Sequence, residues 1–269
     1  MKKIIILTSD GIRHTFLRKA IASNANIQVL KSYCEKHSDQ IYNYAKNSLQ
    51  IKHLIAREIS EKDFFGNFID LVNDNSNPIF IEKDEINNID RINEIIKLNP
   101  DLIIAYGCSI IKEPLLEYFQ RKIINVHLGL SPYYRGSGTN YFPFVNNELQ
   151  FIGATFMYMD KGIDTGEIIH QIQAQIYHND SIHQIGNRLI GNIVKIYIDI
   201  INNFEKLKKI RQPKDKKCGK LYKKIDFTLQ TLIQIDNNFK NGMIENYLKN
   251  KTKIKLYQNP YLNSIKQFI

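Results

Sequence analysis

Three side chains in the middle of the sequence have the types that acyl transfer needs when no metal takes part. Asn125 and His127 stand two residues apart in an apolar run with the character of a strand, so both point to the same side of it. Asp164 follows in a later loop rich in Asp and Gly. An amide can donate to an oxyanion, an imidazole can accept a proton, and a carboxylate can orient and charge the imidazole. No side-chain nucleophile is needed when the substrate is itself an amine.

An Asn and a His at this spacing are, on their own, more often a core histidine and its hydrogen-bonded neighbour. Further motifs follow them in order, namely Pro132-Tyr133-Tyr134-Arg135-Gly136, Gly153-Ala154-Thr155 and Asp164-Thr165-Gly166. Together they resemble the signature of the folate-dependent formyltransferases, a family that includes glycinamide ribonucleotide, methionyl-tRNA and nucleotide-sugar formyltransferases. The resemblance spans residues 1–206 in architecture and is most specific in residues 101–170.

The resemblance implies roles for individual residues. It places the family's catalytic triad on Asn125, His127 and Asp164, with N10-formyltetrahydrofolate as the formyl donor and co-substrate. It also implies that main-chain groups of two loops hold the pterin ring, at Gly107, Cys108, Ser109, Ile110, Ile111, Met159, Asp160, Gly162 and Ile163. The sequence departs from the family at residues 128–132, Leu-Gly-Leu-Ser-Pro, where a small residue or proline after the histidine and a Leu-Leu-Pro ending are usual. This difference concerns the shape of the loop on the acceptor side.

Four further residues are candidates for contact with the amine substrate: Tyr134, Arg135, Arg13 and Lys223. Arg13 follows the first expected strand, where the alternative is an exposed start of a helix. The three basic residues carry the charge that a diphosphate requires. The Gly-Ser-Gly sequence at 136–138 lacks the pattern of a phosphate-binding loop and is interpreted as a flexible loop beside the acceptor. Cys108 has no base beside it in an apolar folate pocket and is not expected to act as a nucleophile.

The elements that must position these residues alternate between strands and helices. Short apolar runs predict strands at residues 4–7, 27–30, 78–81, 102–106, 123–126, 153–159 and 167–173. Helical spacing predicts one helix over residues 12–21 and a long one that starts at a capping box of Ser181 and Gln184. This order predicts an α/β fold with a Rossmann-like, doubly wound and mostly parallel sheet, whose ligands bind beyond the carboxyl ends of the strands.

Two parts are expected along the chain. Residues 1–206 form the catalytic domain, and residues 207–269 form a small, partly helical C-terminal region that begins in a linker of Gln212, Pro213 and basic residues. The apolar residues between Leu221 and Tyr247 are enough for one or two helices packed on the main body. They are too few for an independent domain.

Composition limits the other classes of function. The chain has 269 residues, 43% of them hydrophobic, and a net charge of +10. Ten basic residues and one acid lie between Lys206 and Lys224, where a solvated connector and a phosphate-facing surface are both open. The three cysteines and seven histidines lack the spacing of metal ligands, so no metal is expected. The early apolar run at residues 4–7 is too short for a signal or a membrane span and predicts a cytoplasmic protein without a membrane partner.

The resemblance favours one acceptor. Residues 219–227 are similar to the tail of sugar-modifying members, so the expected substrate is a dTDP- or UDP-linked amino-deoxysugar, as used in lipopolysaccharide or other surface polysaccharides. Methionyl-tRNA formyltransferase is the main alternative, although the barrel that grips tRNA is hard to fit into about 60 residues with helical spacing. Three other functions fit less well: formyl transfer to glycinamide ribonucleotide, hydrolysis of formyl-folate, and a non-catalytic folate- or RNA-binding module. The binding module is disfavoured because the whole triad is present. A nucleic-acid partner is therefore not expected, and a homodimer stays open.

Overall fold

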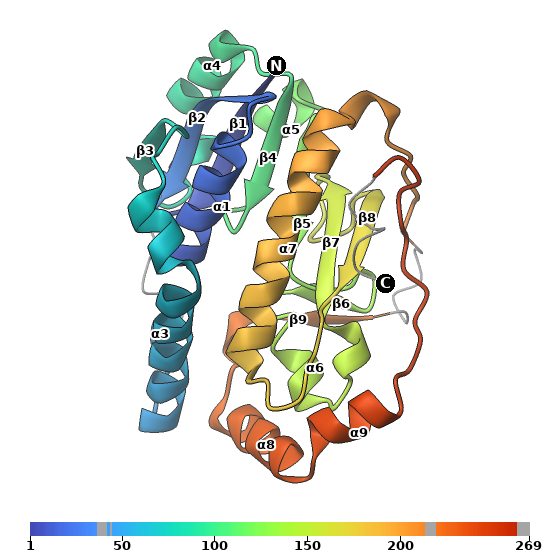
Figure 1. The fold of residues 1–269 in the computed structure, drawn as a ribbon. Helices are drawn as coiled ribbons and strands as arrows, with labels where there is room; N and C mark the ends of the chain where they lie inside the picture. Colours follow the sequence, from blue (N-terminus) through green and yellow to red (C-terminus); the bar gives the residue numbers. More distant parts are fainter. Residues whose placement is uncertain (37–41, 44, 213–218, 263–269) are drawn as a thin grey trace.

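The sheet that organises the molecule has seven strands. In the computed structural model, which describes residues 1–36, 42–43, 45–212 and 219–262, the strand order is β3-β2-β1-β4-β5-β7-β8 (Figure 1). These strands are β1 (Lys2–Ser9), β2 (Ile27–Glu35), β3 (Pro78–Ile81), β4 (Leu102–Tyr106), β5 (Ile123–His127), β7 (Gly153–Tyr158) and β8 (Ile168–Gln173). The first five in the sheet order pair in parallel, while β7 is antiparallel to both of its neighbours. The expected, mostly parallel sheet is confirmed.

Helices cover both faces of the sheet, because strand side chains alternate between two cores (Figure 1). They are α1 (Ile12–Ala22), α4 (Ile89–Leu98), α5 (Leu115–Tyr118) and α7 (Ile182–Asn202). Ile4 and Ile6 of β1 enter one core with α1 and α7, whereas Ile5 and Leu7 enter the other with α4 and α5. Each of these four strand side chains is at most 1% exposed. The predicted capping box at the start of α7 is present, and the doubly wound α/β fold is confirmed.

The strand and helix patterns did not predict α3 (Ser48–Leu71), which lies beside α1 and α7 and extends past the end of the sheet (Figure 1). Its apolar residues do not form a single stripe. Leu54 and Phe65 are buried, but the isoleucines on another face, Ile51, Ile55 and Ile59, are 42%, 45% and 57% exposed. Apolar residues spread in this way give a weak helical periodicity. The helix matters because one of its faces lines the cleft described below.

The C-terminal region folds back along the main domain. Beyond α7 the chain forms β9 (Lys220–Tyr222), α8 (Leu229–Lys240) and α9 (Met243–Lys249). β9 pairs in parallel with β6 (Tyr134–Gly136), and α8 packs on α6 (Phe142–Val145). Short 3-10 helices lie at Glu85–Asn87, Leu149–Phe151, Phe204–Lys206 and Lys224–Asp226. The apolar residues of this region do form two helices, but Leu221 belongs to a strand.

Parts of two earlier expectations fall outside this description. Pro213 of the expected linker and the centre of the basic stretch, residues 213–218, lie outside the described residues. Within the residues that are described, no helix is both long enough and apolar enough to cross a membrane.

The last described residues pack against β8 through a buried histidine. The main-chain N–H of Asn259 donates to Nδ1 of His170 at 3.0 Å, and its side-chain amide donates to the carbonyl oxygen of Ile169 at 3.0 Å. His170 is fully buried, and this burial lowers the pKa of its imidazole to about 4. Because Nδ1 accepts a hydrogen bond, the docking of the C-terminal segment requires a neutral ring.

We expect the free energy of unfolding to fall as the pH drops from about 6.5 to about 4. The folded protein keeps His170 neutral while the unfolded chain takes up a proton, so acid favours unfolding by up to about 1.4 kcal/mol per pH unit for this group. The His170→Asn variant keeps an acceptor for the N–H of Asn259 but does not titrate, and its stability should depend less on pH. Urea unfolding of both proteins across this window measures the effect, and equal pH slopes would contradict the assignment.

Candidate active site

A cleft of about 1040 Å³ opens beyond the carboxyl ends of β1, β4 and β5, where a doubly wound sheet binds ligands. The loop after β4 and the loop between β7 and β8 line one half, which we call the donor half. The other half, the acceptor half, lies against α1, α3 and α7, with β9 and the residues after it on one side. The two halves meet at the end of β5.

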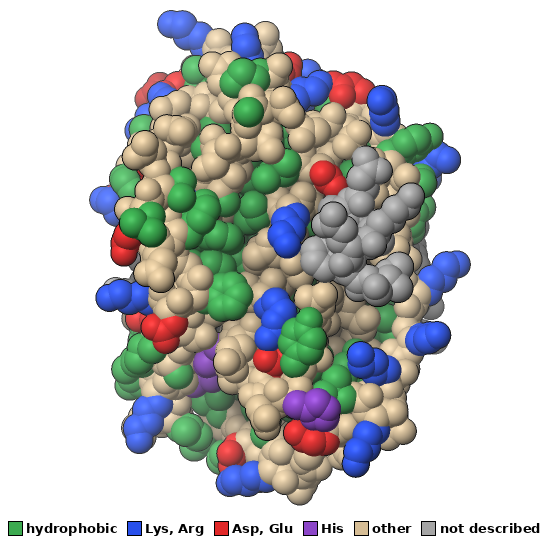
Figure 2. Space-filling model, in the orientation of Figure 1, with side chains coloured by type: hydrophobic (Ala, Val, Ile, Leu, Met, Phe, Trp, Pro, Cys, Tyr) green, Lys and Arg blue, Asp and Glu red, His purple; other side chains and the backbone are tan. Residues whose placement is uncertain are grey.

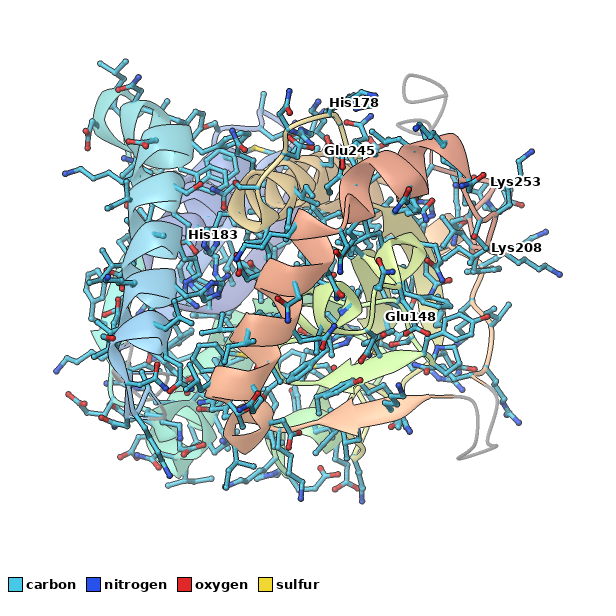
Figure 3. All side chains as sticks on the ribbon, turned by 90° about the horizontal axis from the view of Figure 1, so that it is seen from below. Glu148, His178, His183, Lys208, Glu245 and Lys253 are labelled. Carbon is cyan, nitrogen blue, oxygen red and sulfur yellow. The ribbon has the colours of Figure 1, made fainter. Side chains whose placement is uncertain are left out.

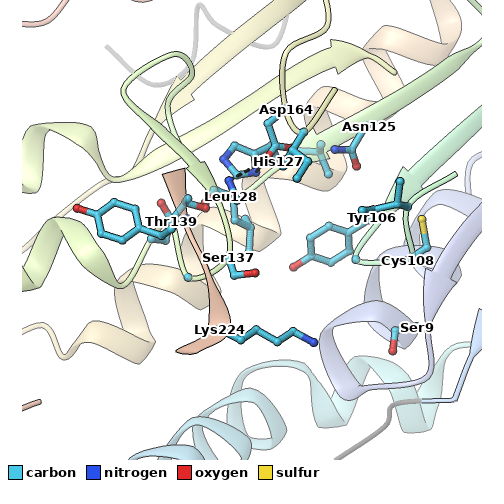
Figure 4. Close-up of a pocket in the computed structure, with 18 of the residues that line it drawn as sticks. Ser9, Tyr106, Cys108, Asn125, His127, Leu128, Ser137, Thr139, Asp164 and Lys224 are labelled. Atoms are coloured by element: carbon cyan, nitrogen blue, oxygen red, sulfur yellow. Dashed lines mark hydrogen bonds and ion pairs between the residues drawn. The ribbon is translucent and has the colours of Figure 1, made fainter. Parts of the chain in front are cut away.

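His127 and Asp164 meet at this junction, with Asn125 beside them (Figure 4). Nδ1 of His127 lies 3.2 Å from Oδ2 of Asp164. The same carboxylate oxygen accepts the main-chain N–H of Gly136 at 2.9 Å, and Nε2 of His127 lies 2.9 Å from the carbonyl oxygen of Tyr134. The structure therefore brings together the three residues that the sequence selected as a triad.

The hydrogen bond from the His127 ring to a main-chain carbonyl places one of its protons. Nε2 faces a carbonyl oxygen, which can only accept, so Nε2 carries a proton. A neutral imidazole would then turn the lone pair of Nδ1 toward the carboxylate of Asp164, and two lone pairs at 3.2 Å repel each other. The carboxylate of Asp164 is therefore placed to accept a proton at Nδ1 whenever the imidazole carries its second proton. The two side chains are 6% and 12% exposed, so water screens the interaction between them only weakly.

The loop that carries Asp164 is held by its own polar groups and by a glycine. Oδ1 of Asp160 accepts a main-chain N–H two residues on at 3.0 Å and the hydroxyl of Thr165 at 2.8 Å. Asp164 has a φ of 54°, a left-handed conformation that costs energy for a residue with a Cβ. At Gly166 a Cβ would lie 1.7 Å from the carbonyl oxygen of Tyr158. The loop therefore presents its carboxylate in one strained arrangement that the surroundings must maintain.

The residues after His127 are fixed by two buried threonines. The hydroxyl of Thr155 donates to the carbonyl oxygen of Gly129 at 2.7 Å and accepts the N–H of Ser131 at 3.0 Å. The hydroxyl of Thr139 donates to the carbonyl of the residue before Gly129. A Cβ at Gly129 would lie 2.6 Å from Nε2 of His127 and 2.8 Å from Cβ of Thr139. Glycine in this loop, which departs from the usual family pattern, is therefore required by the packing around the imidazole.

The loop after β4 is fixed by contacts with neighbouring elements. Gly107 has a φ of 67°, and a Cβ at this position would lie 2.5 Å from Nε2 of His14. The carboxylate of Glu35, at the end of β2, accepts the N–H of Ser109 at 2.6 Å. Burial raises the pKa of the Cys108 thiol to about 12, so the thiol stays protonated at neutral pH. A nucleophilic cysteine at this place is thereby disfavoured.

Apolar side chains from two loops face the donor half. Ile110 is 62% exposed and Ile163 is 49% exposed, and both line the cleft together with Met159. Ile111 also borders it, although its side chain packs into the core between the sheet and α4. Exposed apolar side chains next to main-chain donors and acceptors suit a flat heterocycle with polar edges.

The structure brings two of the four expected acceptor-binding residues to the cleft. Arg13 and Lys223 line it. Tyr134 is 2% exposed and its hydroxyl donates to Glu148. Within the described chain, neither Tyr134 nor Arg135 is among the residues that line the cleft. Their motif contributes main-chain groups instead, because the carbonyl oxygen of Tyr134 holds the imidazole of the triad.

Polar side chains on α3, which the sequence patterns did not select, line the acceptor half. His53, Arg57 and Glu61 recur every four residues and so share one face, and this spacing is a signal that could have revealed them. Glu61 lies 3.6 Å from both Arg57 and Arg13. The rings of His53 and His183 are 4.8 Å apart where α7 faces α3 (Figure 3). Burial lowers the pKa of His53 to about 3 and that of His183 to about 4, so both are neutral at pH 7.

Two more side chains approach the triad from the acceptor half. Tyr106 is 3% exposed, and its hydroxyl has no hydrogen-bond partner among the described residues. Figure 4 shows this hydroxyl pointing into the space between His127 and Lys224. Burial and the nearby Lys83 lower the pKa of Lys224. In the described ranges, no cluster of three or more His, Cys, Asp or Glu side chains could hold a metal ion.

Comparison with known proteins identifies the family. The profile of the Formyl transferase family matches residues 2–201, and the chain belongs to this family. The methionyl-tRNA formyltransferase of Desulforamulus reducens is 35% identical over 121 residues, which are 45% of this chain and 38% of that protein. The chain spans about half or less of the length of the curated relatives it matches.

Solved structures of this family share the fold. A sugar N-formyltransferase from a Shewanella species has a TM-score of 0.55 at 17% identity, with 87% of each chain covered. A phosphoribosylglycinamide formyltransferase from Anaplasma phagocytophilum has a TM-score of 0.55 at 15% identity and covers 83% of this chain and 100% of its own. At such identities the comparison establishes the architecture and leaves the acceptor to be argued from the site.

Replacing His127 or Asn125 with Ala is expected to lower turnover by about two to four orders of magnitude, the range for losing general-base or oxyanion assistance. Asp164→Asn should have a similar effect, because a neutral amide cannot stabilise an imidazolium. His178 is exposed and outside the cleft (Figure 3), so His178→Ala is the control and should keep the wild-type rate. Steady-state kinetics, with melting temperatures to establish folding, measure these changes. Near wild-type turnover in the His127 or Asn125 variant would exclude the triad.

A single methyl group at Gly129 should also impair the site. The added Cβ would press on Nε2 of His127 and on Thr139, so we expect Gly129→Ala to lower kcat about tenfold or more by displacing the imidazole. Gly191 in α7 has no atom within 4 Å of an added Cβ, and Gly191→Ala should leave kcat unchanged. Equal activity of the two alanine variants would show that Gly129 does not constrain the imidazole.

Proposed function

We propose that this chain is an N-formyltransferase that moves the formyl group of N10-formyltetrahydrofolate to the amine of a dTDP- or UDP-linked amino-deoxysugar. The observation that carries the proposal is the contact between His127 and Asp164, with Asn125 beside it, where the donor and acceptor halves of the cleft meet. An amine in one half and a formyl group in the other would both reach these three side chains. The product would serve the synthesis of surface polysaccharides, and the reaction would take place in the cytoplasm.

The residues of the triad divide the work of the reaction. The folate co-substrate supplies a formyl group bonded to a nitrogen atom. Asn125 donates from its carboxamide to the formyl oxygen as that oxygen gains negative charge, and protonated His127 stabilises the same charge. Asp164 promotes removal of the proton that the attacking amine loses when its nitrogen bonds to the formyl carbon. The His127–Asp164 pair then returns a proton to the folate nitrogen as the bond between that nitrogen and the formyl carbon breaks.

The acceptor half has the groups that a nucleotide-linked sugar needs. Arg13, Arg57, Lys223 and Lys224 line it, and guanidinium and ammonium groups bind the oxygens of a diphosphate. The buried hydroxyl of Tyr106 is placed to pair with a polar group of a ligand beside the triad. These side chains support an anionic acceptor of modest size.

The described part of the C-terminal region supports a small acceptor over tRNA. Residues 219–262 contain one short strand, one short 3-10 helix, two α-helices and an extended end, which do not make a barrel. On the face in Figure 2, the Lys and Arg side chains of the described residues are scattered over the surface and around its outline and do not gather into one broad patch. A tRNA surface requires clustered basic side chains that contact several phosphates.

Methionyl-tRNA formyltransferase is the second candidate. The sequence relatives carry that name, and the basic stretch between Lys206 and Lys224 is an observation in its favour. The relatives are matched over only part of their length, so their acceptor does not transfer with the catalytic region.

A formylation assay with a panel of dTDP- and UDP-linked amino sugars decides between these acceptors. We expect a product heavier by one formyl group in mass spectrometry, no formylation of charged initiator tRNA, and a shallow dependence of KM on salt, because few phosphates are bound. A folate analogue should raise the melting temperature by mass action. Faster formylation of methionyl-tRNA than of any sugar would overturn the acceptor and leave the triad intact. A saturating folate analogue without effect on melting would count against formyl transfer itself.

A further inference from the structure

The segment that follows α7 contacts the loop that carries Asp164. The carboxamide nitrogen of Gln212 donates to the carbonyl oxygen of Asp164 at 3.0 Å and to that of Gly166 at 2.8 Å. The same nitrogen lies 3.8 Å from Sδ of Met157, a weak acceptor, so the two carbonyl oxygens of the loop are its main partners. The side chain of Gln212 is half-buried, which favours these bonds over exchange with water.

The main chain of the same segment is joined to the start of β8. Ile210 and Ile168 exchange two main-chain hydrogen bonds, at 2.8 and 3.0 Å, in antiparallel register. Beside them, Nζ of Lys209 lies 2.9 Å from Oε2 of Glu167. This register places Gln212 opposite Gly166, where the two segments have no further main-chain bridge and the carboxamide makes the contact instead.

We infer that Gln212 is a positioning residue that holds the carboxylate of Asp164 against His127. Asp164 has a φ of 54°, and its carbonyl oxygen accepts a hydrogen bond from Gln212. This bond fixes the orientation of the peptide plane that follows Asp164. Without a donor at this place the plane is free to turn, and the carboxylate leaves Nδ1 of His127. The role rests on the proposed function of Asp164 in formyl transfer. It also makes the site depend on a residue beyond the part of the chain, 2–201, that the family profile matches.

Three substitutions at Gln212 separate the donor from the rest of the side chain. Gln212→Glu keeps the shape of the side chain but replaces the N–H donor with carboxylate oxygens, which repel the two carbonyl oxygens. Gln212→Leu removes the polar group. Gln212→Lys keeps N–H donors on a chain of similar reach. The matched control is Gln173→Leu, because the carboxamide of Gln173, also half-buried, donates to the carbonyl oxygen of Gln150 at 2.7 Å away from this loop.

Two measurements test the inference in the full-length protein. In the Glu and Leu variants we expect kcat to fall about tenfold or more while KM for both substrates stays within about threefold, since a displaced carboxylate affects the chemical step. Hydrogen–deuterium exchange of residues 160–166 should speed up in these variants only. Gln212→Lys should stay within about threefold of the wild-type kcat, and Gln173→Leu should match the wild type in both measurements.

Each result decides the question. If the Leu variant does not fold, the Glu and Lys variants are compared, and equal kcat and exchange for these two would overturn the role. Exchange of residues 160–166 at the wild-type rate in the Glu variant would also overturn the role. So would an equal loss of kcat in Gln212→Leu and Gln173→Leu that is proportional to the loss of melting temperature, because it would show a general effect of stability. If the wild-type protein transfers no formyl group, the proposed function is wrong. The exchange data would still show whether Gln212 holds the loop of residues 160–166.

Discussion

The contact between a histidine and a carboxylate, 3.2 Å apart in a cleft where both are nearly buried, is the one on which the rest of the site depends. Taking such charges out of water costs several kcal/mol unless fixed polar groups replace the solvent. Here the N–H of Gly136 and the carbonyl oxygen of Tyr134 replace it. Both groups belong to β6, whose pairing partner is β9. The C-terminal region is thereby tied to the electrostatics of the triad, although it supplies none of the three side chains.

The sequence was sufficient for the features that local pattern controls. Short apolar runs predicted the strands, and the spacing of Asn125 and His127 on β5 predicted that both would reach one cleft. Asp164 was predicted from the order of the motifs and not from geometry. Along the chain, 36 residues and two strands lie between it and His127, although the two side chains are 3.2 Å apart in the structure. The capping box of α7 was readable because both of its partners lie within one helical turn.

The features that the sequence did not reveal depend on contacts between distant segments or on main-chain atoms. Tyr134 and Arg135 were selected for their side chains, whereas the structure uses the carbonyl oxygen of Tyr134. A sequence distinguishes residues by their side chains, so it carries no signal for a role that a main-chain carbonyl oxygen performs. The strand β9 is three residues long and forms only because β6 lies beside it. The bonds of Gln212 reach back 46 and 48 residues, to Gly166 and Asp164, and no local periodicity reports them.

The two halves of the cleft also differ in how they are built, and this difference bears on the choice of acceptor. The donor half consists of loops that leave neighbouring strands of the sheet, so its shape is set by the fold that the family shares. The acceptor half is made by α3 and by residues that follow β9, and these segments are joined to each other. The carboxamide of Gln50 donates to the carbonyl oxygen of Phe227 at 2.7 Å, and Leu54 packs with Phe227 and Leu232 in a small separate core. The acceptor half can therefore be remodelled through these two joined segments, provided that the pairing of β6 with β9, which supports the His127–Asp164 contact, is kept.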